Sequence, residues 1–502
     1  MTEHVLRHAE RLADRTAIAD GPTGRSYSYA DLAGAIGRVA GGLAENGFEK
    51  EDVLAILLPN LPEYAIAFHA AATLGGIVTT INPTYTTGEI AFQLRDSNAK
   101  LVLTISLFHE TARAAAEGTG VDEIFILDSH EGARSFFELL AADPLDRTTD
   151  VSASDVVALP YSSGTTGLPK GVELTHGNLV SNLSQTEPLS TVGEEDVILA
   201  VLPFFHIYGM QVLMNGVLFH GAMSVTMPRF DLADFLETIQ RHRVTRVALV
   251  PPIVVALAKH PMVDEYDLSS LVQIGSGAAP LSAEVEELAS QRTGAEVVQG
   301  FGLTETSPVT HTALPGLARS GSIGVLVPNT DARVVDPASG EDMGRDRPGE
   351  LWLRGPQVMK GYLGNPEATE AAFENGWFKT GDIAVVDEDD HWYITDRLKE
   401  LIKYKGFQVA PAELEAVLLN HEDIADAAVI GVADEDAGEV PKAFVVARSG
   451  VSITPEEVMA HVAERVASYK KVRHVEFIDE IPKSLSGKIL RRVLRERAST
   501  EV

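Results

Sequence analysis

Short apolar runs alternate with helical patterns over the first 300 residues, and this alternation limits the possible folds more than any other feature of the sequence. Clear cases are residues 53–58 followed by 61–73, 246–250 followed by 252–259, and 272–274 followed by 282–291. Strands that alternate with helices in this way form βαβ units and mostly parallel sheets. Because sites in such sheets lie in loops beyond the carboxyl ends of the strands, we expect the chemistry in the glycine-rich turns that follow these runs.

The pattern changes twice after residue 300. Short alternating runs at 331–335, 350–354 and 392–395 are separated by Gly, Asp and Pro turns, which predicts a small antiparallel, barrel-like β subdomain at about 320–396. A helix from Ala410, strands around 427–432 and 442–447, and a helix that opens at Thr454 and carries Val458, Val462 and Val466 on one face predict a further α+β unit. The predicted fold class is α/β, with an N-terminal domain at 1–396, a C-terminal domain at 397–502 and a hinge near 396–400.

Composition excludes several classes of protein. The chain has 502 residues, 45% hydrophobic and 23% charged, which is typical of a folded protein and not of a disordered one. Its net charge of −31 opposes binding to nucleic acid or to an anionic membrane. The absence of cysteine excludes disulfides, thiolate metal sites and a cysteine nucleophile.

Lysine is scarce and unevenly distributed. Eight of the 14 lysines follow residue 396, which indicates that the C-terminal part handles anions. An acidic proteome or a salt-adapted host would explain the net charge but not this clustering.

The first 20 residues lack a basic segment followed by an apolar one, so we expect no signal peptide and a cytoplasmic location. The apolar stretch 64–81 is interpreted as helix, turn and strand and not as a membrane span.

The strongest local motif directly follows the apolar run 156–159. Its glycines let backbone N–H groups approach an anion, its hydroxyls add donors and its lysine adds charge, a combination that suits a polyphosphate. It differs from the Walker pattern, because Leu and Pro follow the last glycine before the lysine. A flexible surface turn is the alternative, which the lack of acidic residues in so acidic a chain disfavours. The predicted nucleotide-binding residues of this loop are Ser162, Ser163, Gly164, Thr165, Thr166, Gly167 and Lys170.

Five motifs together resemble the adenylate-forming superfamily of acyl-CoA synthetases, and within it the 4-coumarate-CoA ligases. They are SSGTTGLPKGV at 162–172, QGFGLTE at 299–305, GELWLRG at 349–355, TGD at 380–382 and DRLKELIKYKGFQVAPAE at 396–413. They run in family order and span nearly the whole chain. The resemblance implies a ligase that makes an acyl-adenylate from a carboxylic acid and Mg-ATP and then transfers the acyl group to coenzyme A (CoA).

The resemblance also implies residue roles. Lys488 matches the catalytic lysine, which supplies positive charge when a carboxylate attacks the α-phosphate. A solvated tail lysine is the alternative, disfavoured because Arg491 and Arg492 would suffice for solubility. Glu305 matches the Mg²⁺ ligand, although an isolated Thr-Glu pair would be interpreted as a helix cap. The remaining nucleotide contacts implied are Gln299, Gly300, Thr304, Asp382 and Arg397.

In the family, a mobile C-terminal domain rotates about the hinge and presents first Lys488 and then the loop at residues 405–406. Lys403 and Gln408 match catalytic residues, and Arg229, Lys405 and Gly406 match CoA contacts. His206 matches a histidine beside the substrate carboxylate, although a lone histidine among aromatics is more often a core residue. The implied acyl-substrate residues are Ile207, Tyr208, Gln211, Ala248, Gly275, Gly277, Ala278, Phe301, Gly302, Pro308, Val309, Thr310 and Lys399.

The apolar character of that pocket favours an aromatic or alkyl acid over an amino acid, whose ammonium would need a buried carboxylate. Plant coumarate ligases commonly carry Asn, Met and Lys where this chain has Gln211, Ala248 and Gly275. A hydroxycinnamate such as 4-coumarate is the expected substrate, and a medium-chain fatty acid or another aryl acid is the alternative. A nucleotide-binding regulator without turnover is a further alternative, against which the retained Lys488, Glu305 and Asp382 argue. We expect a monomer or weak homodimer.

Overall fold

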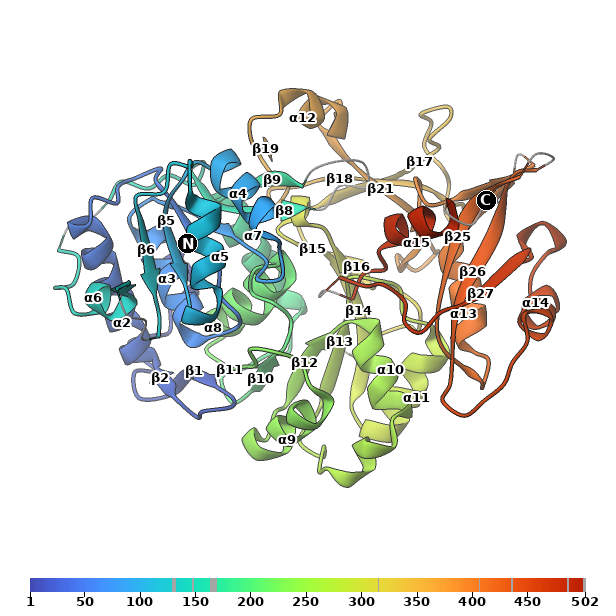
Figure 1. The fold of residues 1–502 in the computed structure, drawn as a ribbon, viewed down its shortest axis with the longest axis horizontal. Helices are drawn as coiled ribbons and strands as arrows, with labels where there is room; N and C mark the ends of the chain where they lie inside the picture. Colours follow the sequence, from blue (N-terminus) through green and yellow to red (C-terminus); the bar gives the residue numbers. More distant parts are fainter. Residues whose placement is uncertain are drawn as a thin grey trace.

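The computed structural model describes residues 1–128, 132–146, 149–162, 169–314, 316–405, 407–434, 437–484 and 487–499. Two large sheets fill the N-terminal part, a smaller sheet borders them, and a separate unit formed by the last hundred residues lies to one side (Figure 1).

The first large sheet has nine strands with a parallel centre and antiparallel edges. In spatial order they are β16 (Val325–Leu326), β15 (Val309–Thr312), β14 (Glu296–Gly302), β13 (Gln273–Ser276), β12 (Arg246–Leu249), β10 (Val197–Ala200), β11 (Met223–Thr226), β1 (Thr16–Asp20) and β2 (Ser26–Ser28).

The second large sheet has eight strands and is parallel except at β8–β9 and β9–β19. In spatial order they are β19 (Gly361–Tyr362), β9 (Lys170–Thr175), β8 (Val156–Ser162), β4 (Ile77–Thr80), β3 (Val53–Ile56), β5 (Ala99–Thr104), β6 (Glu123–Ile126) and β7 (Arg134–Ser135).

Two five-stranded sheets complete the fold. The first is antiparallel and contains β17 (Asp331–Val335), β18 (Gly349–Arg354), β20 (Phe373–Glu374), β21 (Trp377–Val386) and β22 (Trp392–Arg397). The second, in the C-terminal unit, contains β23 (Ile402–Tyr404), β24 (Phe407–Val409), β25 (Ile424–Asp434), β26 (Gly438–Ala447) and β27 (His474–Phe477).

Helices cover and separate these sheets. They are α1 (Thr2–Val5), α2 (Tyr29–Glu45), α3 (Pro62–Thr73), α4 (Thr87–Asp96), α5 (Ser106–Ala116), α6 (Phe136–Leu140), α7 (His176–Thr186), α8 (Val217–Phe219), α9 (Leu232–His242), α10 (Pro251–Lys259), α11 (Ala283–Thr293), α12 (Pro366–Ala372), α13 (Pro411–Leu419), α14 (Pro455–Ala463) and α15 (Arg491–Ser499). Short 3₁₀ turns are η1 (Glu187–Leu189), η3 (Pro261–Glu265), η4 (Thr304–Thr306) and η5 (Ser468–Lys470), and η2 (Tyr208–Gly216) is a π-helix.

Helix α3 explains how the two large sheets share one core. It packs on β1 of the first sheet and on β3 and β4 of the second, and nearly all its residues are buried. A helix that is apolar all round belongs in a protein interior, which is why the stretch 64–81 has the composition of a membrane segment without being one. Within the described residues, no helix has both the length and the apolar character needed to cross a bilayer.

The predicted α/β fold class is confirmed, while the domain boundaries and the hinge stay predictions. The predicted antiparallel subdomain corresponds to the sheet of β17, β18, β20, β21 and β22, while β16 and β19 from the same stretch pair with β15 and β9 of the large sheets. One detail of the expectation is wrong. The helix opened by Thr454 ends at Ala463, so Val466 packs on the core from beyond the helix.

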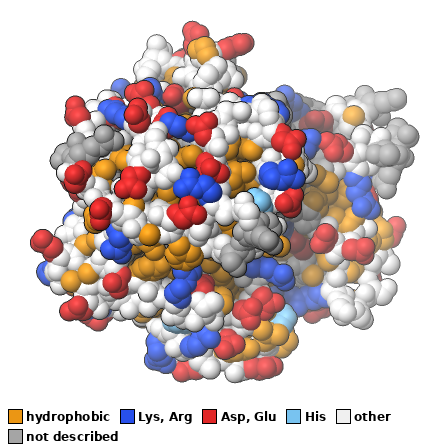
Figure 2. All heavy atoms as spheres, turned by 60° about the vertical axis from the view of Figure 1, so that its left-hand side comes forward, with side chains coloured by type: hydrophobic (Ala, Val, Ile, Leu, Met, Phe, Trp, Pro, Cys, Tyr) orange, Lys and Arg blue, Asp and Glu red, His pale blue; other side chains and the backbone are white. Residues whose placement is uncertain are grey.

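Acidic side chains are spread over the surface. On the face in Figure 2, Asp and Glu alternate with Lys and Arg around apolar patches. Many of these charges form surface ion pairs, such as Arg11 with Glu194 and Arg319 with Asp389. Exposed pairs of this kind contribute little to stability, so the fold depends mainly on its buried core.

Candidate active site

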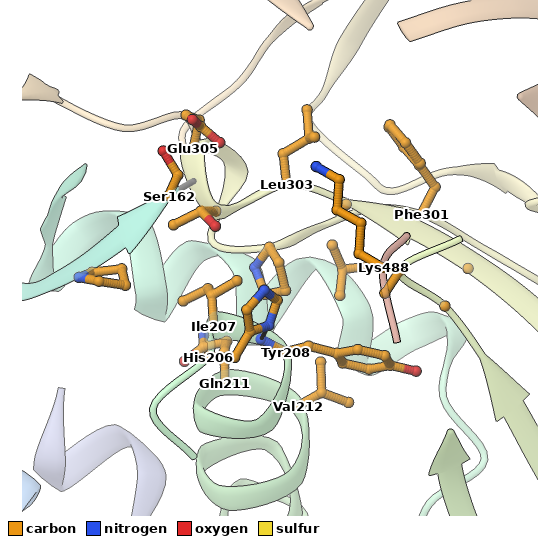
Figure 3. Close-up of a pocket in the computed structure, with 18 of the residues that line it drawn as sticks. Ser162, His206, Ile207, Tyr208, Gln211, Val212, Phe301, Leu303, Glu305 and Lys488 are labelled. Atoms are coloured by element: carbon orange, nitrogen blue, oxygen red, sulfur yellow. Dashed lines mark hydrogen bonds between the residues drawn. The ribbon is translucent and has the colours of Figure 1, made fainter. Parts of the chain in front are cut away.

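A cavity of about 1560 Å³ opens where the carboxyl ends of strands from both large sheets meet the C-terminal unit. Small-molecule pockets usually measure about 300–1,000 Å³, so this one has room for more than one ligand. Its position agrees with the expectation that turns after the parallel strands carry the site. Figure 3 shows its labelled side chains, with Glu305 and Lys488 above the helical segment that bears His206 and Tyr208.

Lys488 is held in the cavity by a tight turn. The Gly487 N–H donates to the Ser484 carbonyl at 2.8 Å, and the Ser484 N–H donates to the Lys488 carbonyl at 2.8 Å. The side chain reaches in beside Leu303 (Figure 3). Burial lowers the pKa of Lys488 to about 8, helped by the nearby Arg397 cation and opposed by the carboxylates of Glu400, Asp382 and Glu305.

Asp382 and Arg397 lie opposite each other on β21 and β22 and form an ion pair, with 3.0 Å between Asp382 Oδ1 and Arg397 Nε. The other oxygen, Asp382 Oδ2, is buried and has no hydrogen-bond partner among the described residues. Burial raises the pKa of Asp382 against the opposing effect of Arg397, and Asp382 in turn raises the pKa of Arg397. An unsatisfied buried carboxylate oxygen is costly, which favours a ligand that donates a hydrogen bond there.

Glu305 lies on η4 and is fixed from two sides. Its carbonyl accepts a hydrogen bond from the Met359 N–H at 2.8 Å, and its Oε1 accepts one from the Tyr362 hydroxyl at 3.0 Å. Lys170 Nζ lies 4.6 Å from the centre of the Tyr362 ring, so Tyr362 connects the lysine of the hydroxyl-rich loop to Glu305. Ser162 and Thr304 line the same part of the cavity.

His206 is a neutral donor in this site. Its Nδ1 accepts a hydrogen bond from the Tyr208 N–H at 3.3 Å, which assigns the ring proton to Nε2. Burial, and secondarily the Lys488 cation, lower the pKa of His206 to about 4, so the ring is uncharged near pH 7. A neutral imidazole beside an ammonium can hold an anionic oxygen without adding a second full charge.

Tyr208, Gly277 and Ala278 form one side of the cavity. The Tyr208 ring packs on Gly277, where a Cβ atom would lie 3.0 Å from Tyr208 Cε1, so a larger residue there would displace the ring. Ala278 has φ +70°, a strained backbone conformation of the kind that clusters at functional sites. Gln211, which lines the cavity, is held in place because its Nε2 donates to the Leu179 carbonyl and its Oε1 accepts from Asn215.

Most of the predicted site residues come together in this cavity. Those that line it are Ser162, Lys170, His206, Ile207, Tyr208, Gln211, Ala248, Gly275, Gly277, Ala278, Gln299, Gly300, Phe301, Gly302, Thr304, Glu305, Pro308, Val309, Arg397, Lys399 and Lys488. Asp382 lies directly behind Arg397. Gln299 is anchored away from solvent by Glu286 of α11, to which its Nε2 donates at 2.9 Å.

The other predicted residues lie elsewhere. Thr310 is fully buried and its hydroxyl donates a hydrogen bond to the Phe301 carbonyl, so Thr310 does not line the cavity. Lys403 and Gln408 face each other across the exposed β23–β24 hairpin, next to Lys405, and Arg229 is exposed after β11. The predicted loop residues Ser163, Gly164, Thr165, Thr166 and Gly167, and the predicted CoA contact Gly406, lie outside the described residues.

Three site residues were missed from the sequence. Tyr362 holds Glu305, and Glu400 adds a carboxylate beside Lys488. Arg491 was interpreted as a residue that aids solubility, and this is wrong because its side chain is only 9% exposed. Its Nε lies 2.7 Å from Glu400 Oε2, and its Nη1 forms a second ion pair with Glu415 Oε1. Buried arginine that bridges two carboxylates is an internal support. No local pattern in the sequence signals this role, because Glu400 and Glu415 lie 91 and 76 residues away along the chain.

Comparison with known proteins identifies the family. The model of the AMP-binding enzyme family matches residues 5–363, and the model of the AMP-binding enzyme C-terminal domain matches 413–488. The chain is 45% identical over 500 residues to 4-coumarate–CoA ligase 1 of Solanum tuberosum, covering 97% of this chain and 92% of that one. It is 44% identical over 513 residues to 4-coumarate–CoA ligase 3 of Oryza sativa subsp. japonica, covering 100% and 93%.

Solved structures agree. The anthranilate CoA ligase AuaEII in complex with anthranoyl-AMP superposes with a TM-score of 0.93 at 26% identity, covering 100% of this chain and 97% of that one. ATP-bound MatB from Rhodopseudomonas palustris superposes with a TM-score of 0.90 at 30% identity, covering 99% and 98%. This chain therefore belongs to the AMP-binding enzyme family of adenylate-forming, ATP-dependent acid-thiol ligases.

Proposed function

We propose that this protein joins 4-coumarate or a related hydroxycinnamate to CoA in two half-reactions. In the first, a substrate carboxylate oxygen attacks the α-phosphorus of ATP, a P–O bond forms, and pyrophosphate leaves with the electrons of the broken P–O bond. In the second, the CoA thiol loses its proton to solvent, its sulfur forms a bond to the acyl carbonyl carbon, and AMP leaves with the electrons of the broken acyl C–O bond. The observation that carries the proposal is Lys488 inside one cavity with Glu305, His206 and Arg397, whose ion-pair partner Asp382 lies behind it.

The first half-reaction brings two anions together, so the site must supply positive charge and fixed donors. We assign Lys488 to the α-phosphate and the transferring carboxylate, and Lys170 with the hydroxyl-rich loop to the β- and γ-phosphates. His206 Nε2–H would donate to the substrate carboxylate. The unsatisfied Asp382 Oδ2 would accept from the ribose hydroxyls, because a carboxylate can accept from both.

Mg²⁺ belongs to the proposal as well. Among the described residues, no three His, Asp or Glu side chains gather to form a metal site, but Mg²⁺ usually takes only one or two carboxylates and completes its shell with water and phosphate oxygens. Glu305 fits that need, because Tyr362 occupies Oε1 alone and leaves Oε2 for a ligand. A bound Mg²⁺ would neutralise phosphate charge.

The second half-reaction needs a different arrangement. The exposed Lys403, Lys405 and Gln408 lie on the β23–β24 hairpin and not in the cavity. We therefore propose that the C-terminal unit rotates about residues 396–400, withdraws Lys488 and brings this hairpin to the acyl-adenylate, with Arg229 as a CoA phosphate contact. A cytoplasmic location and a monomeric or weakly dimeric state complete the proposal.

A second candidate substrate class has structural support. One N–H of Gln211 is used by the Leu179 carbonyl and its Oε1 accepts from Asn215, which leaves a single N–H for a phenolic hydroxyl, and Ala248 and Gly275 are small. Medium-chain fatty acids or other aryl acids are the alternative.

The deciding experiment is acid-dependent exchange of pyrophosphate into ATP with 4-coumarate, benzoate, octanoate and amino acids. We expect exchange with 4-coumarate and none with amino acids. Absence of exchange with every acid would refute catalysis, and a nucleotide-binding regulator would take its place. Exchange without formation of acyl-CoA would refute the second half-reaction alone.

A further inference from the structure

The cavity does not end at the predicted acyl pocket. It continues along η2 into α8, where the lining residues Tyr208, Val212, Gly216 and His220 recur at intervals of four. Residues at that spacing form one stripe on a helix, and twelve residues span roughly 18 Å at an α-helical rise, somewhat less in a π-helix. The start of this wall, from His206 to Val212, is visible in Figure 3.

The opposite wall is the face of the first large sheet. Strand register places Ala248 beside Gly275. Two residues closer to the start of each strand, it places Arg246 beside Gln273. All four residues line the cavity. The two rows are two residues apart, about 6.6 Å along a strand. An extended chain advances about 1.2 Å per bond, so the second row adds room for roughly five more carbons.

Among the described residues, no side chain crowds Gly275 between the two rows. A Cβ atom on Gly275 would meet only the Val247 carbonyl oxygen at 3.7 Å and Ala248 Cα at 3.9 Å, with no side chain opposing it. The side walls past this point are the buried apolar residues Leu183, Ile198, Leu213 and Val217. A long apolar passage suits an alkyl chain, because each buried methylene contributes favourably.

The far end of the passage is polar and reaches the surface at Thr191, which is exposed. Arg246 lies there and is held by its neighbours: Nη1 donates to Gln273 Oε1, Nη2 donates to the Thr191 carbonyl, and the buried Nε lies 3.1 Å from Asp196 Oδ2 in an ion pair without a hydrogen bond. A second carboxylate at the distal end of a substrate would have to displace Asp196. The passage therefore favours an uncharged chain end.

We propose that this second section of the cavity, from Val212 and Gly275 to Arg246, is a channel for the distal part of monocarboxylic acids longer than a one-ring hydroxycinnamate. The substrate class it adds is medium- to long-chain alkanoic acids, or aryl acids with a long apolar stem. This inference rests on the proposed ligase function for the carboxylate end of the substrate. It adds that Gly275 and Val212 determine how long an acyl chain the enzyme accepts.

The test measures kcat/KM for AMP formation with hexanoate, octanoate, decanoate and dodecanoate, with 4-coumarate as the reference acid. In the unaltered enzyme we expect kcat/KM to rise about three- to fourfold for each methylene that enters the channel, through decanoate at least. Gly275→Leu should reduce decanoate turnover at least tenfold more than hexanoate turnover. Val212→Phe, which blocks the channel from the opposite wall, should have the same selective effect.

Ile274→Leu is the matched control. Ile274 is the neighbour of Gly275 on β13, is fully buried, and points to the opposite face of the sheet. This variant should leave the ratio of decanoate to hexanoate turnover unchanged. Using a ratio within each variant separates a blocked channel from a misfolded site, because misfolding lowers both acids equally.

The outcomes distinguish the two proposals. No turnover with any acid overturns the ligase function itself. Turnover of 4-coumarate together with a tenfold or greater fall in kcat/KM from octanoate to decanoate overturns the channel alone. Equal losses of hexanoate and decanoate turnover in both Gly275→Leu and Val212→Phe, in variants whose thermal unfolding midpoint matches that of the unaltered enzyme, would also overturn it.

Discussion

Gly487 packs directly against Val250, so that a Cβ atom on Gly487 would lie 2.9 Å from the Val250 Cβ. Gly487 precedes Lys488, and Val250 is the N-cap of α10 in the large N-terminal part. The lysine therefore enters the cavity on a turn that touches the other part of the chain through a residue without a side chain. Lys259, at the other end of α10, donates to the Leu419 carbonyl at 3.4 Å and marks the same interface.

The first prediction concerns this contact. Gly487→Ala should lower the rate of adenylate formation about tenfold, because the added methyl group must push the lysine turn away from α10. Gly450→Ala is the matched control: both glycines have positive φ, +75° and +81°, but nothing lies within 4 Å of Gly450. The double variant Gly487→Ala, Val250→Ala should recover part of the lost rate. Equal effects of the two glycine variants would contradict the packing argument.

Lys488→Met should reduce adenylate formation by a factor of about 10²–10³, the usual cost of removing one preorganised electrostatic group. The thioester half-reaction, started from pre-formed acyl-adenylate and CoA, should keep most of its rate. Rapid-quench measurement of each half-reaction checks this. Lys470→Met, which removes a lysine paired with Glu413 at 2.6 Å, is the control and should change neither rate. A comparable loss in both half-reactions would remove Lys488 from its assigned step.

The pH dependence of adenylation should follow Lys488. Its pKa is lowered to about 8, so the ammonium is present below pH 8 and is lost as the pH rises through that value. We expect kcat/KM for adenylate formation to fall about tenfold per pH unit above pH 8, because this parameter reports the free enzyme. Lys488→Arg should be slower but should keep its rate to pH 10, since a guanidinium stays charged. An unchanged alkaline limb in Lys488→Arg would assign the titration to another group.

Asp396 should make the protein less stable as the pH rises from about 4 to 7. Burial raises its pKa to about 7, although the Arg397 and Ala412 N–H groups and Arg491 favour the charged form. The folded state then binds the proton more tightly than the unfolded state, so stability is lost as the pH rises through the folded pKa, by up to about 4 kcal/mol. Thermal unfolding of Asp396→Asn at pH 4.5 and 7.5 should show a smaller loss of stability over this interval than the unaltered protein. Identical differences would place the proton elsewhere.

Tyr362→Phe should weaken Mg²⁺ binding and leave the fold intact. The lost hydroxyl donates to Glu305 Oε1 at 3.0 Å and fixes the proposed ligand, so its removal should raise the Mg²⁺ concentration for half-maximal activity about three- to tenfold. Glu305→Gln should have a larger effect. Tyr393→Phe is the control, because its hydroxyl binds Asp387 away from the cavity. A Mg²⁺ titration of AMP formation in the three variants decides the matter.

The sequence alone determined the fold class and the family, because both depend on short-range patterns. Strand and helix periods alternate within a few residues of each other, and the motifs at 162–172 and 299–305 need glycines and hydroxyls at fixed local spacing. Twenty-one of the predicted site residues accordingly line one cavity. The pairing of β16 and β19 with the large sheets was beyond this reasoning, since two-residue strands have no period of their own.

Only the tertiary structure decided which side chains support the site and how far the cavity extends. Arg491 contacts Glu400 and Glu415, 91 and 76 residues away along the chain, and Tyr362 contacts Glu305 across 57 residues. Gln211 looks available in the sequence but is partly occupied by Leu179 and Asn215 once the chain is folded. Packing between distant segments of the chain determines these partners. Because an unsatisfied polar group is costly when buried, buried polar side chains are found paired with one another. No local pattern in the sequence shows which distant segments will lie side by side.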